Sequence, residues 1–289
     1  MERPLTVTAK RVVRAVLPRG TRNWLRSPKA SASWLWDDLK YSFGVTSSIE
    51  IRPGWSLTCH PLAYRCAYFA QQDDPEQVAE FDAFIKSATE NMVLFDIGAH
   101  FGLFSLAALH YGGPKARALA VDPSPVAAKF LRIQSALNNV DERLTVVQAA
   151  VTDCAGWHDM VPTGVIGSGY YVSPDEAHSS SDMHKTRACT IDGLAAEFDM
   201  KPTHIKIDVE GYEAAVLRGA SEALAGEAAP VIFLEVHNEI VRNLGNDPGE
   251  TLEVLREAGY ETFSMDEFPI GAGKILAQPL LRIIAKRKN

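Results

Sequence analysis

Five short runs of almost uninterrupted apolar residues limit most strongly how this chain can fold. They alternate with helix-like stretches at 101–111, 125–138, 211–225 and 249–258. Because the runs are apolar on both faces, they are typical of strands in a parallel sheet that helices cover on each side. The sequence therefore predicts a doubly wound α/β fold. The five predicted strands are 92–97, 116–122, 144–151, 204–209 and 231–236.

Two further strands are predicted near the end of the chain, at 260–265 and 280–287. Pro269, Gly271 and Gly273 lie between them, and this connection is too short for a crossover helix. We therefore expect the last two strands to be antiparallel. They complete a mostly parallel, seven-stranded sheet with helices on both faces and an N-terminal extension.

The 289 residues divide into three predicted parts. Residues 1–30 form a basic arm, 31–90 form an N-terminal cap with a less regular pattern, and 91–289 form the main domain. Within the main domain, 152–185 contains two clusters of glycine and serine, which indicate a loop insert. Since loops on a rigid sheet often carry binding functions, we expect the cap and the insert to cover the acceptor.

The charge is unevenly distributed along the chain. The basic arm has eight Lys and Arg side chains and one acid; the whole chain has a net charge of −7, so the remainder sums to −14. The arm could contact an anionic surface, but Pro18 and Gly20 interrupt its helical pattern, which favours a solvated leader. The acidic body argues against a dedicated nucleic-acid-binding protein.

The sequence also bears on location. No apolar run approaches the roughly 20 residues that a transmembrane helix needs, and no secretory leader is recognised. The four cysteines contain no C-x-x-C pair, so we expect reduced thiols in a cytoplasmic protein.

Acidic residues end or follow four of the five strands, at the edge where a parallel sheet binds its ligands. Asp96 precedes a turn with Gly98 and Gly102, and Asp122 ends the next strand. The turn fits neither the G-x-G-x-x-G dinucleotide pattern nor a P-loop, which favours a ligand with positive charge and no phosphate. S-adenosylmethionine has these properties, and Asp122 is suited to bind its ribose. The alternative is a plain turn with Asp96 as a helix cap.

Three segments resemble the FkbM family of S-adenosylmethionine-dependent methyltransferases, which are class I, Rossmann-like enzymes. They are DIGAHFG (96–102), AVDPSP (120–125) and, above all, IKIDVEGYEAAVLRGA (205–220), and the likeness covers about 90–287. The resemblance implies that the glycine turn contacts the methionine and ribose groups and that the adenine ring lies near 149–150. The implied cofactor-binding residues are Asp96, Gly98, Ala99, His100, Phe101, Gly102, Asp122, Ala149 and Ala150.

A second polar group is predicted to carry the chemistry. Asp208 and Glu210 alternate along one strand, and Glu235 and His237 alternate along its neighbour, so all four side chains are expected to converge. Asp208, Glu235 and His237 are then the candidate ligands of Mg²⁺ or Mn²⁺. Alternatively, His237 acts as a general base without a metal.

These residues also have structural interpretations. His237 could be a packed histidine that bonds to a carbonyl, and Glu210 could pair with Lys206 or Arg218 at the surface. Glu213 and Arg218 are expected on a solvated helix face, and Lys206 is expected to point to the opposite side of the sheet.

The most consistent function is an S-adenosylmethionine-dependent O-methyltransferase that acts on a hydroxyl of a small molecule or glycan. Oxygen as the accepting atom rests on the resemblance alone. The alternatives are an NAD-dependent oxidoreductase, which the missing G-x-G-x-x-G disfavours, and a binding module without catalysis.

Overall fold

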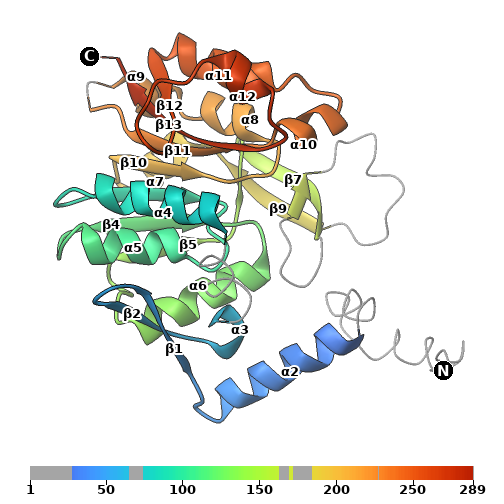
Figure 1. Cartoon of the computed structure of the whole chain (residues 1–289). Coiled ribbons are helices and arrows are strands. Elements are labelled where there is room, and N and C mark those ends of the chain that lie inside the picture. The colour runs from blue at the N-terminus through green and yellow to red at the C-terminus, as the bar shows by residue number, and fades with distance from the viewer. Residues whose placement is uncertain (1–27, 65–73, 163–168, 172–183, 227, 289) are drawn as a thin grey trace, which may run out of the picture.

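The computed structural model describes residues 28–64, 74–162, 169–171, 184–226 and 228–288. Its centre is a seven-stranded sheet with the order β12–β13–β11–β10–β3–β4–β5 (Figure 1). The strands from β11 to β5 are parallel, whereas β13 runs antiparallel to both of its neighbours. The predicted sheet, including its antiparallel C-terminal pair, is confirmed. The strands are β3 (Val93–Ile97), β4 (Arg117–Val121), β5 (Leu144–Val147), β10 (His204–Ile207), β11 (Val231–Val236), β12 (Tyr260–Phe263) and β13 (Leu281–Arg287).

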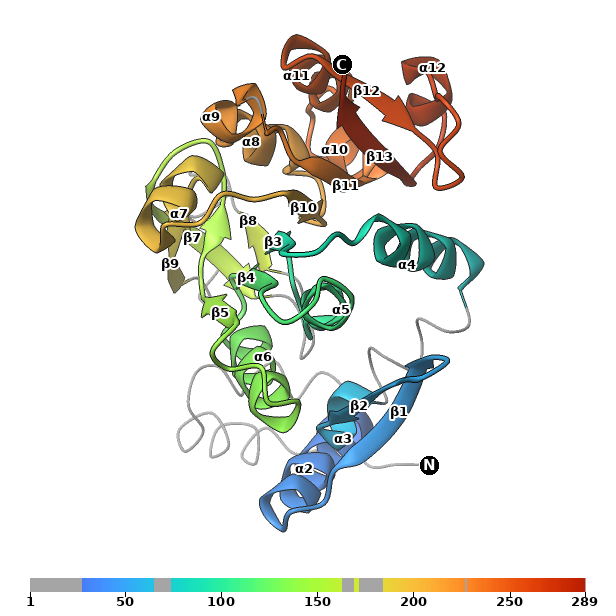
Figure 2. The same cartoon turned by 90° about the vertical axis from the view of Figure 1, so that its left-hand side faces the viewer.

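Helices cover both faces of this sheet, as Figure 2 shows. Helices α4, α5 and α6 pack into one apolar cluster, and α7, α8, α9 and α11 pack into another. Leu94 and Phe95 belong to different clusters because successive side chains of a strand point to opposite faces. The helices are α4 (Pro75–Ser87), α5 (Leu103–Tyr111), α6 (Pro125–Leu137), α7 (Ile191–Phe198), α8 (Glu213–Arg218), α9 (Ser221–Ala225), α10 (Asn238–Asn243), α11 (Gly249–Glu257) and α12 (Ala272–Leu276).

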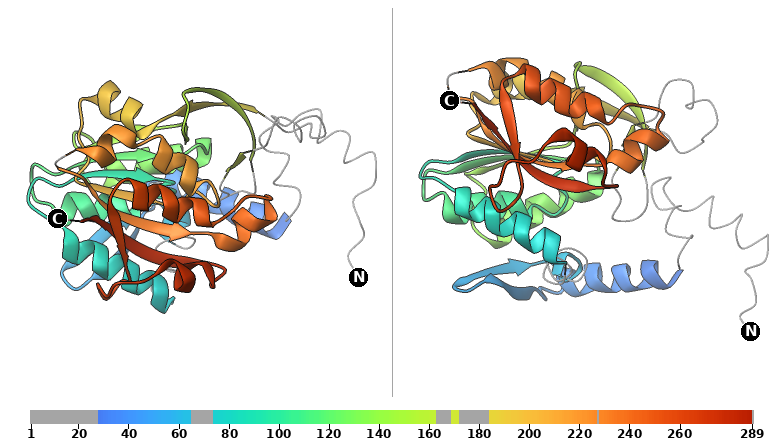
Figure 3. Two further views of the ribbon diagram at one scale, coloured as in Figure 1. Left: turned by 90° about the horizontal axis from the view of Figure 1, so that it is seen from above. Right: turned by 45° about the horizontal axis from the view of Figure 1, so that its top comes forward.

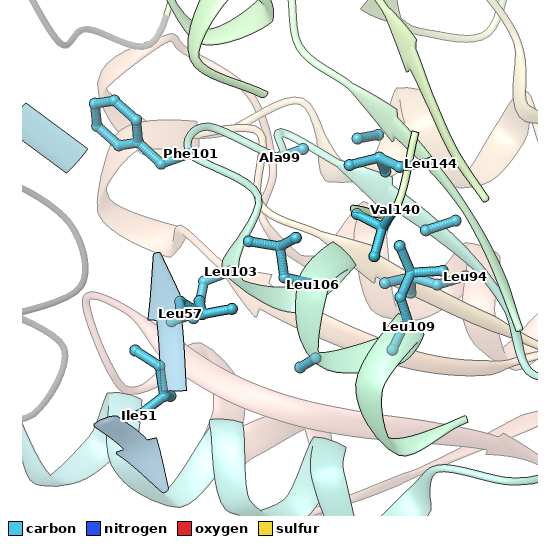
Figure 4. Packing of buried hydrophobic residues seen from close by; sticks show 14 of the residues in the cluster. Ile51, Leu57, Leu94, Ala99, Phe101, Leu103, Leu106, Leu109, Val140 and Leu144 are labelled. Carbon is cyan, nitrogen blue, oxygen red and sulfur yellow. The ribbon is translucent and has the colours of Figure 1, made fainter. Parts of the chain in front are cut away.

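The N-terminal part forms α2 (Pro28–Ser42), a hairpin of β1 (Ser47–Arg52) and β2 (Trp55–Cys59), and the short helix α3 (Pro61–Ala63). The hairpin inserts Ile51 and Leu57 into the same apolar cluster as α5 (Figure 4), whereas α2 lies at the outer edge of the molecule (Figure 3). Almost all of the predicted basic arm lies outside the described residues. The division into arm, cap and main domain stays a prediction.

The predicted loop insert contains regular structure. A separate four-stranded sheet has the order β6–β9–β7–β8, so the expectation of a loop over 152–185 is wrong for its described parts. The single strand predicted over 144–151 is two strands in the structure: β5 belongs to the seven-stranded sheet, and β6 belongs to the four-stranded sheet. The strands of the second sheet are β6 (Ala150–Val151), β7 (Gly156–Pro162), β8 (Gly169–Tyr171) and β9 (His184–Cys189).

The helix predicted over 211–225 is divided into α8 and α9. A Cβ atom at Gly219 would lie 2.2 Å from the carbonyl oxygen of Thr152, so the two segments approach closely where the helix is interrupted. Among the described helices, none is both long and apolar enough to cross a membrane.

Candidate active site

A cavity opens at the carboxyl edge of the sheet, beside the point where strand order reverses between β3 and β10. Such a reversal is the usual ligand-binding position in open parallel sheets. The ends of β3, β4 and β10 and the segment between β5 and β6 form its walls. Five of the nine predicted cofactor-binding residues line it: Gly98, His100, Asp122, Ala149 and Ala150.

Other lining residues were not predicted. Met160 belongs to β7, which the sequence analysis assigned to a loop, and Tyr212 precedes α8. Val121 and Val151 adjoin predicted residues, so their position in the chain was the available signal. Met160 carried no such signal, because only the folding of the second sheet brings it to the cavity.

Gly98 brings the turn after β3 against the backbone after β10. Its φ angle is 80°, and a Cβ atom added there would lie 1.8 Å from the carbonyl oxygen of Asp208. Only glycine fits this contact without a backbone shift. His100 and Glu210 also line the cavity and both have φ angles of 50°, a conformation that costs energy for residues with a side chain. Two residues with strained backbone therefore line the cavity.

Asp122 presents a buried carboxylate to the cavity. Its Oδ2 atom accepts a hydrogen bond from the backbone N–H of His100 at 3.0 Å, and its Oδ1 atom accepts one from the N–H of Ser124 at 2.8 Å. Burial raises the pKa of Asp122 to about 6. No lysine or arginine among the described residues forms an ion pair with it. A ligand with positive charge or hydroxyl donors would therefore stabilise its charged form.

Asp96 does not line the cavity. Its side chain is 2% exposed, and its Oδ2 atom accepts hydrogen bonds from the N–H and the Oγ of Ser105, at 3.1 and 2.6 Å. Since Ser105 lies in the first turn of α5, these bonds hold the start of that helix, in agreement with the capping alternative. Direct contact between Asp96 and a cofactor stays a prediction.

Three other residues of the turn also lie outside the cavity lining. Phe101 is buried against Phe130, with 5.0 Å between the ring centroids. At Gly102 an added Cβ atom would lie 2.6 Å from Leu131, so this glycine permits close packing on α6. Ala99 is buried as well, and it anchors the turn by donating its N–H to the carbonyl of Val121. These residues support the shape of the turn, and their direct contact with a cofactor stays a prediction.

Asp208, Glu235 and His237 lie together, and one ligand atom of each is within 4.8 Å of the others. The expected cause, alternation along two strands, is wrong for two of them. Strand β10 ends at Ile207 and β11 ends at Val236, so Asp208 and His237 follow the strands. Glu210 lines the cavity from the turn that leads to α8.

Glu235 belongs to a buried charge cluster, which we define as Glu80, Lys206, Glu235 and Arg282. Its oxygens lie 3.2 Å from Lys206 Nζ and 3.1 Å from an Arg282 nitrogen. Glu80 of α4 bridges the same two cations, at 3.0 and 3.3 Å. Although burial alone would raise it, Lys206 and Arg282 lower the pKa of Glu235 to about 2. The cluster therefore pairs two cations with two acids: Glu235 is held in its charged form, whereas burial raises the pKa of Glu80 to about 7.

This pairing does not fit a divalent cation. Both oxygens of Glu235 already contact cationic side chains, and Lys206 Nζ lies 3.2 Å from one of them. A divalent ion bound by that carboxylate would be repelled by the ammonium group. The three predicted ligands are thus close enough for Mg²⁺ or Mn²⁺, but the carboxylate of Glu235 is already paired with two cations, and we assign no metal to the three residues.

His237 forms a pair with Glu213 of α8. Its Nδ1 atom lies 2.7 Å from Glu213 Oε1, and its Nε2 atom lies 3.7 Å from Asp208 Oδ1. A carboxylate can only accept, so Nδ1 carries the hydrogen. Burial alone would lower the pKa of His237, but the hydrogen bond and charge of Glu213, with the charge of Asp208, raise it above its ordinary 6.5. The imidazole is thus held in one tautomer, with Nε2 directed at Asp208.

Glu213 was predicted on a solvated helix face, and this is wrong. Its side chain is fully buried, and it also accepts a hydrogen bond from the N–H of Gly211 at 2.9 Å. The turn at 208–212 rotates the first turn of α8 toward the end of β11. Helical periodicity alone gives no sign of that rotation, although Glu213 lies within the segment IKIDVEGYEAAVLRGA.

Residues 96–262, more than half of the chain, match the model of the methyltransferase FkbM domain. The chain belongs to the FkbM methyltransferase family. The hexuronic acid methyltransferase AglP of Haloferax volcanii is 25% identical over 181 residues, which are 62% of this chain and 67% of AglP. The 31-O-demethyl-FK506 methyltransferase FkbM of Streptomyces tacrolimicus is 28% identical over 221 residues, which are 66% of this chain and 80% of that protein. The solved structure of a precorrin-6y C5,15-methyltransferase from Geobacter metallireducens aligns with a TM-score of 0.43 at 17% identity, covering 74% of this chain and 90% of that one.

The FkbM domain contains the cavity and the His237–Glu213 pair. The buried charge cluster extends beyond it, because Glu80 precedes the matched range and Arg282 follows it. Two of the four residues of the buried charge cluster thus come from segments outside the family domain.

Proposed function

We propose that this FkbM-family methyltransferase uses S-adenosylmethionine to methylate a hydroxyl group of a small molecule or glycan. The observation that carries the proposal is the acid-lined cavity at the carboxyl edge, next to a histidine held in one tautomer by Glu213. The relatives support the acceptor class, because their names specify a hexuronic acid and a 31-O-demethyl compound.

The residues present fit the proposed cofactor. Gly98 leaves the backbone bare at the cavity, and the small side chains of Ala149 and Ala150 leave room for a planar ring. Asp122 has acceptor capacity left after its two backbone hydrogen bonds, and ribose hydroxyls are suitable donors. When bound, S-adenosylmethionine supplies an electrophilic methyl group. Gly98, Asp122, Ala149 and Ala150 would hold it.

The proton of the acceptor hydroxyl needs a base as the oxygen becomes a nucleophile. His237 can accept it at Nε2, while Glu213 keeps the hydrogen on Nδ1 and stabilises the imidazolium that forms. Asp208 lines the cavity, and its Oδ1 atom lies 3.7 Å from Nε2, so His237 adjoins the cavity lining without itself being part of it. A positioned base typically contributes about 10²- to 10⁴-fold in rate.

Methyl-labelled S-adenosylmethionine, incubated with a cell extract and the full chain, tests the function. We expect mass spectrometry to detect label in a hydroxyl-bearing metabolite. His237→Gln should reduce the incorporation at least a hundredfold, whereas His110→Gln, at an exposed histidine stacked on Trp55, should not change it. Label in neither the native sample nor the control would contradict the proposal.

Thermal shift separates this proposal from the alternatives. S-adenosylhomocysteine should raise the melting temperature, and NAD should not; the reverse would favour an oxidoreductase. Removal of residues 1–30 should leave the response to S-adenosylhomocysteine intact, whereas a binding module that depends on the basic arm would lose its only activity.

A further inference from the structure

Helix α2 exposes a stripe of large apolar side chains. Leu35, Trp36, Leu39 and Phe43 are 56%, 58%, 45% and 78% exposed. Their spacing of three and four residues places them on one side of the helix and its last turn. We call these four residues the α2 stripe. A contiguous apolar surface of this kind is uncommon on proteins that have no partner there.

The charged side of α2 faces the protein. Asp37 is 4% exposed, and Asp38 lies 3.1 Å from Lys129 and 3.2 Å from His60. Tyr41 packs on His60, with 4.6 Å between the ring centroids. A surface helix normally buries its apolar face and exposes its charges, and α2 has the opposite orientation. Over the described side chains of α2, from residue 35 onward, Asp37, Asp38 and Tyr41 thus contact the protein, and the stripe is left available to a partner.

We propose that the α2 stripe docks on an anionic membrane surface. The arm, with eight Lys and Arg side chains and one acid in residues 1–30, leads directly into α2. Basic segments attract anionic lipid headgroups, while Trp, Leu and Phe insert at the boundary of the acyl region. Of the two acids of α2, Asp37 is buried and Asp38 is paired with Lys129, which limits their opposition to this attraction.

The charge distribution favours a membrane over a second copy of the chain. Two copies that packed through the stripe would each join a segment of net charge +7 to the packed helix, and these like charges repel. The rest of the chain, with its charge of −14, would be repelled by an anionic surface everywhere else. Binding would therefore be oriented through α2. It is independent of methyl transfer.

Vesicle flotation of the full chain tests this docking. The probes are vesicles of phosphatidylcholine alone and vesicles with 30% phosphatidylglycerol. We expect binding to the anionic vesicles only, with loss in 0.5 M salt. Replacing Trp36, Leu39 and Phe43 together by serine should weaken binding at least tenfold. Since all three are exposed, the variant should keep its native melting temperature.

The matched control replaces Trp157 and Phe268 by serine, because each is 70% exposed and neither belongs to the stripe. This control should bind vesicles as the native chain does. The proposal is overturned if the native chain does not float with anionic vesicles or if the stripe variant binds equally well. It is also overturned if light scattering shows a native dimer that the stripe variant converts to a monomer, because a second copy then occupies the stripe.

Discussion

The acids of the buried charge cluster and the acids that line the cavity differ in which groups stabilise their negative charge. In the buried charge cluster, Glu235 contacts both Lys206 and Arg282, which hold its pKa low. At the cavity, Asp122 is held by backbone N–H groups and burial raises its pKa to about 6. The protein thus supplies the counter-charges for one group and leaves the other to accept a ligand.

This difference separates a structural role from a binding role. Paired acids and cations in a buried network tie α4 to the sheet, and removing one partner leaves an uncompensated charge. An acid at a cavity without a cation partner is less stable in its charged form until a donor or a cation arrives. The comparison therefore predicts opposite consequences for changes in the two groups.

The largest effect is expected in the buried charge cluster. Lys206→Met leaves Glu80 and Glu235 short of one cation, so we expect a loss of about 3–5 kcal/mol in the free energy of unfolding. Lys286→Met is the matched control, because Lys286 pairs with Glu267 at 3.1 Å on the surface, and it should cost less than about 1 kcal/mol. Chemical denaturation measures both. Equal losses would show that the cluster has no special structural weight.

The next effect concerns the shape of the cavity. Gly98→Ala combines an unfavourable φ angle with a collision against the backbone of Asp208, and we expect a loss of roughly 3 kcal/mol. Gly54→Ala has a similar φ angle of 82° but no atom within 4 Å of the added carbon, so it should cost about 1 kcal/mol. The difference between the two measured unfolding energies isolates the collision. A difference near zero would mean that the two strand ends separate easily.

A smaller effect is expected on the chemistry. Glu213→Gln keeps the size of the side chain but removes the charge that stabilises an imidazolium, so turnover should fall about tenfold to a hundredfold. The pH profile gives a more specific readout. The base must be neutral, so kcat/KM should rise with pH through a value above 6.5 in the native enzyme. In Glu213→Gln that inflection should move down toward 6.5; an unmoved inflection would show that Glu213 does not act through His237.

The sequence predicts the sheet well because its strands are buried on both faces and therefore form continuous apolar runs. It also identifies the edge where Gly98 and Asp122 meet. Local patterns do not reveal how side chains are paired across the fold, and Asp122 and Glu235 look alike as acids at strand ends. The cations that distinguish them come from β10 and β13.

The role of Glu213 and the second sheet could not be predicted for a related reason. The position of Glu213 depends on the turn at Glu210 and Gly211, where the φ angles are 50° and 102°, and the second sheet depends on pairing between strands that are separate in the sequence. Hydrophobic periodicity predicts which side of a helix or strand is apolar. It does not predict how that element is oriented against the elements that pack on it. The loop expected over 152–185 is wrong for its described parts on that account, because β7, β8 and β9 pair only after folding.

Calorimetric titration with S-adenosylhomocysteine tests the central claim most directly, namely that the acids at the cavity are kept for a ligand. We expect one site per native chain. Asp122→Asn should weaken the affinity at least tenfold, or about 1.4 kcal/mol, and Asp141→Asn, at an exposed aspartate in a turn, should not change it. No binding to the native chain, or an affinity that Asp122→Asn leaves unchanged, would contradict the account.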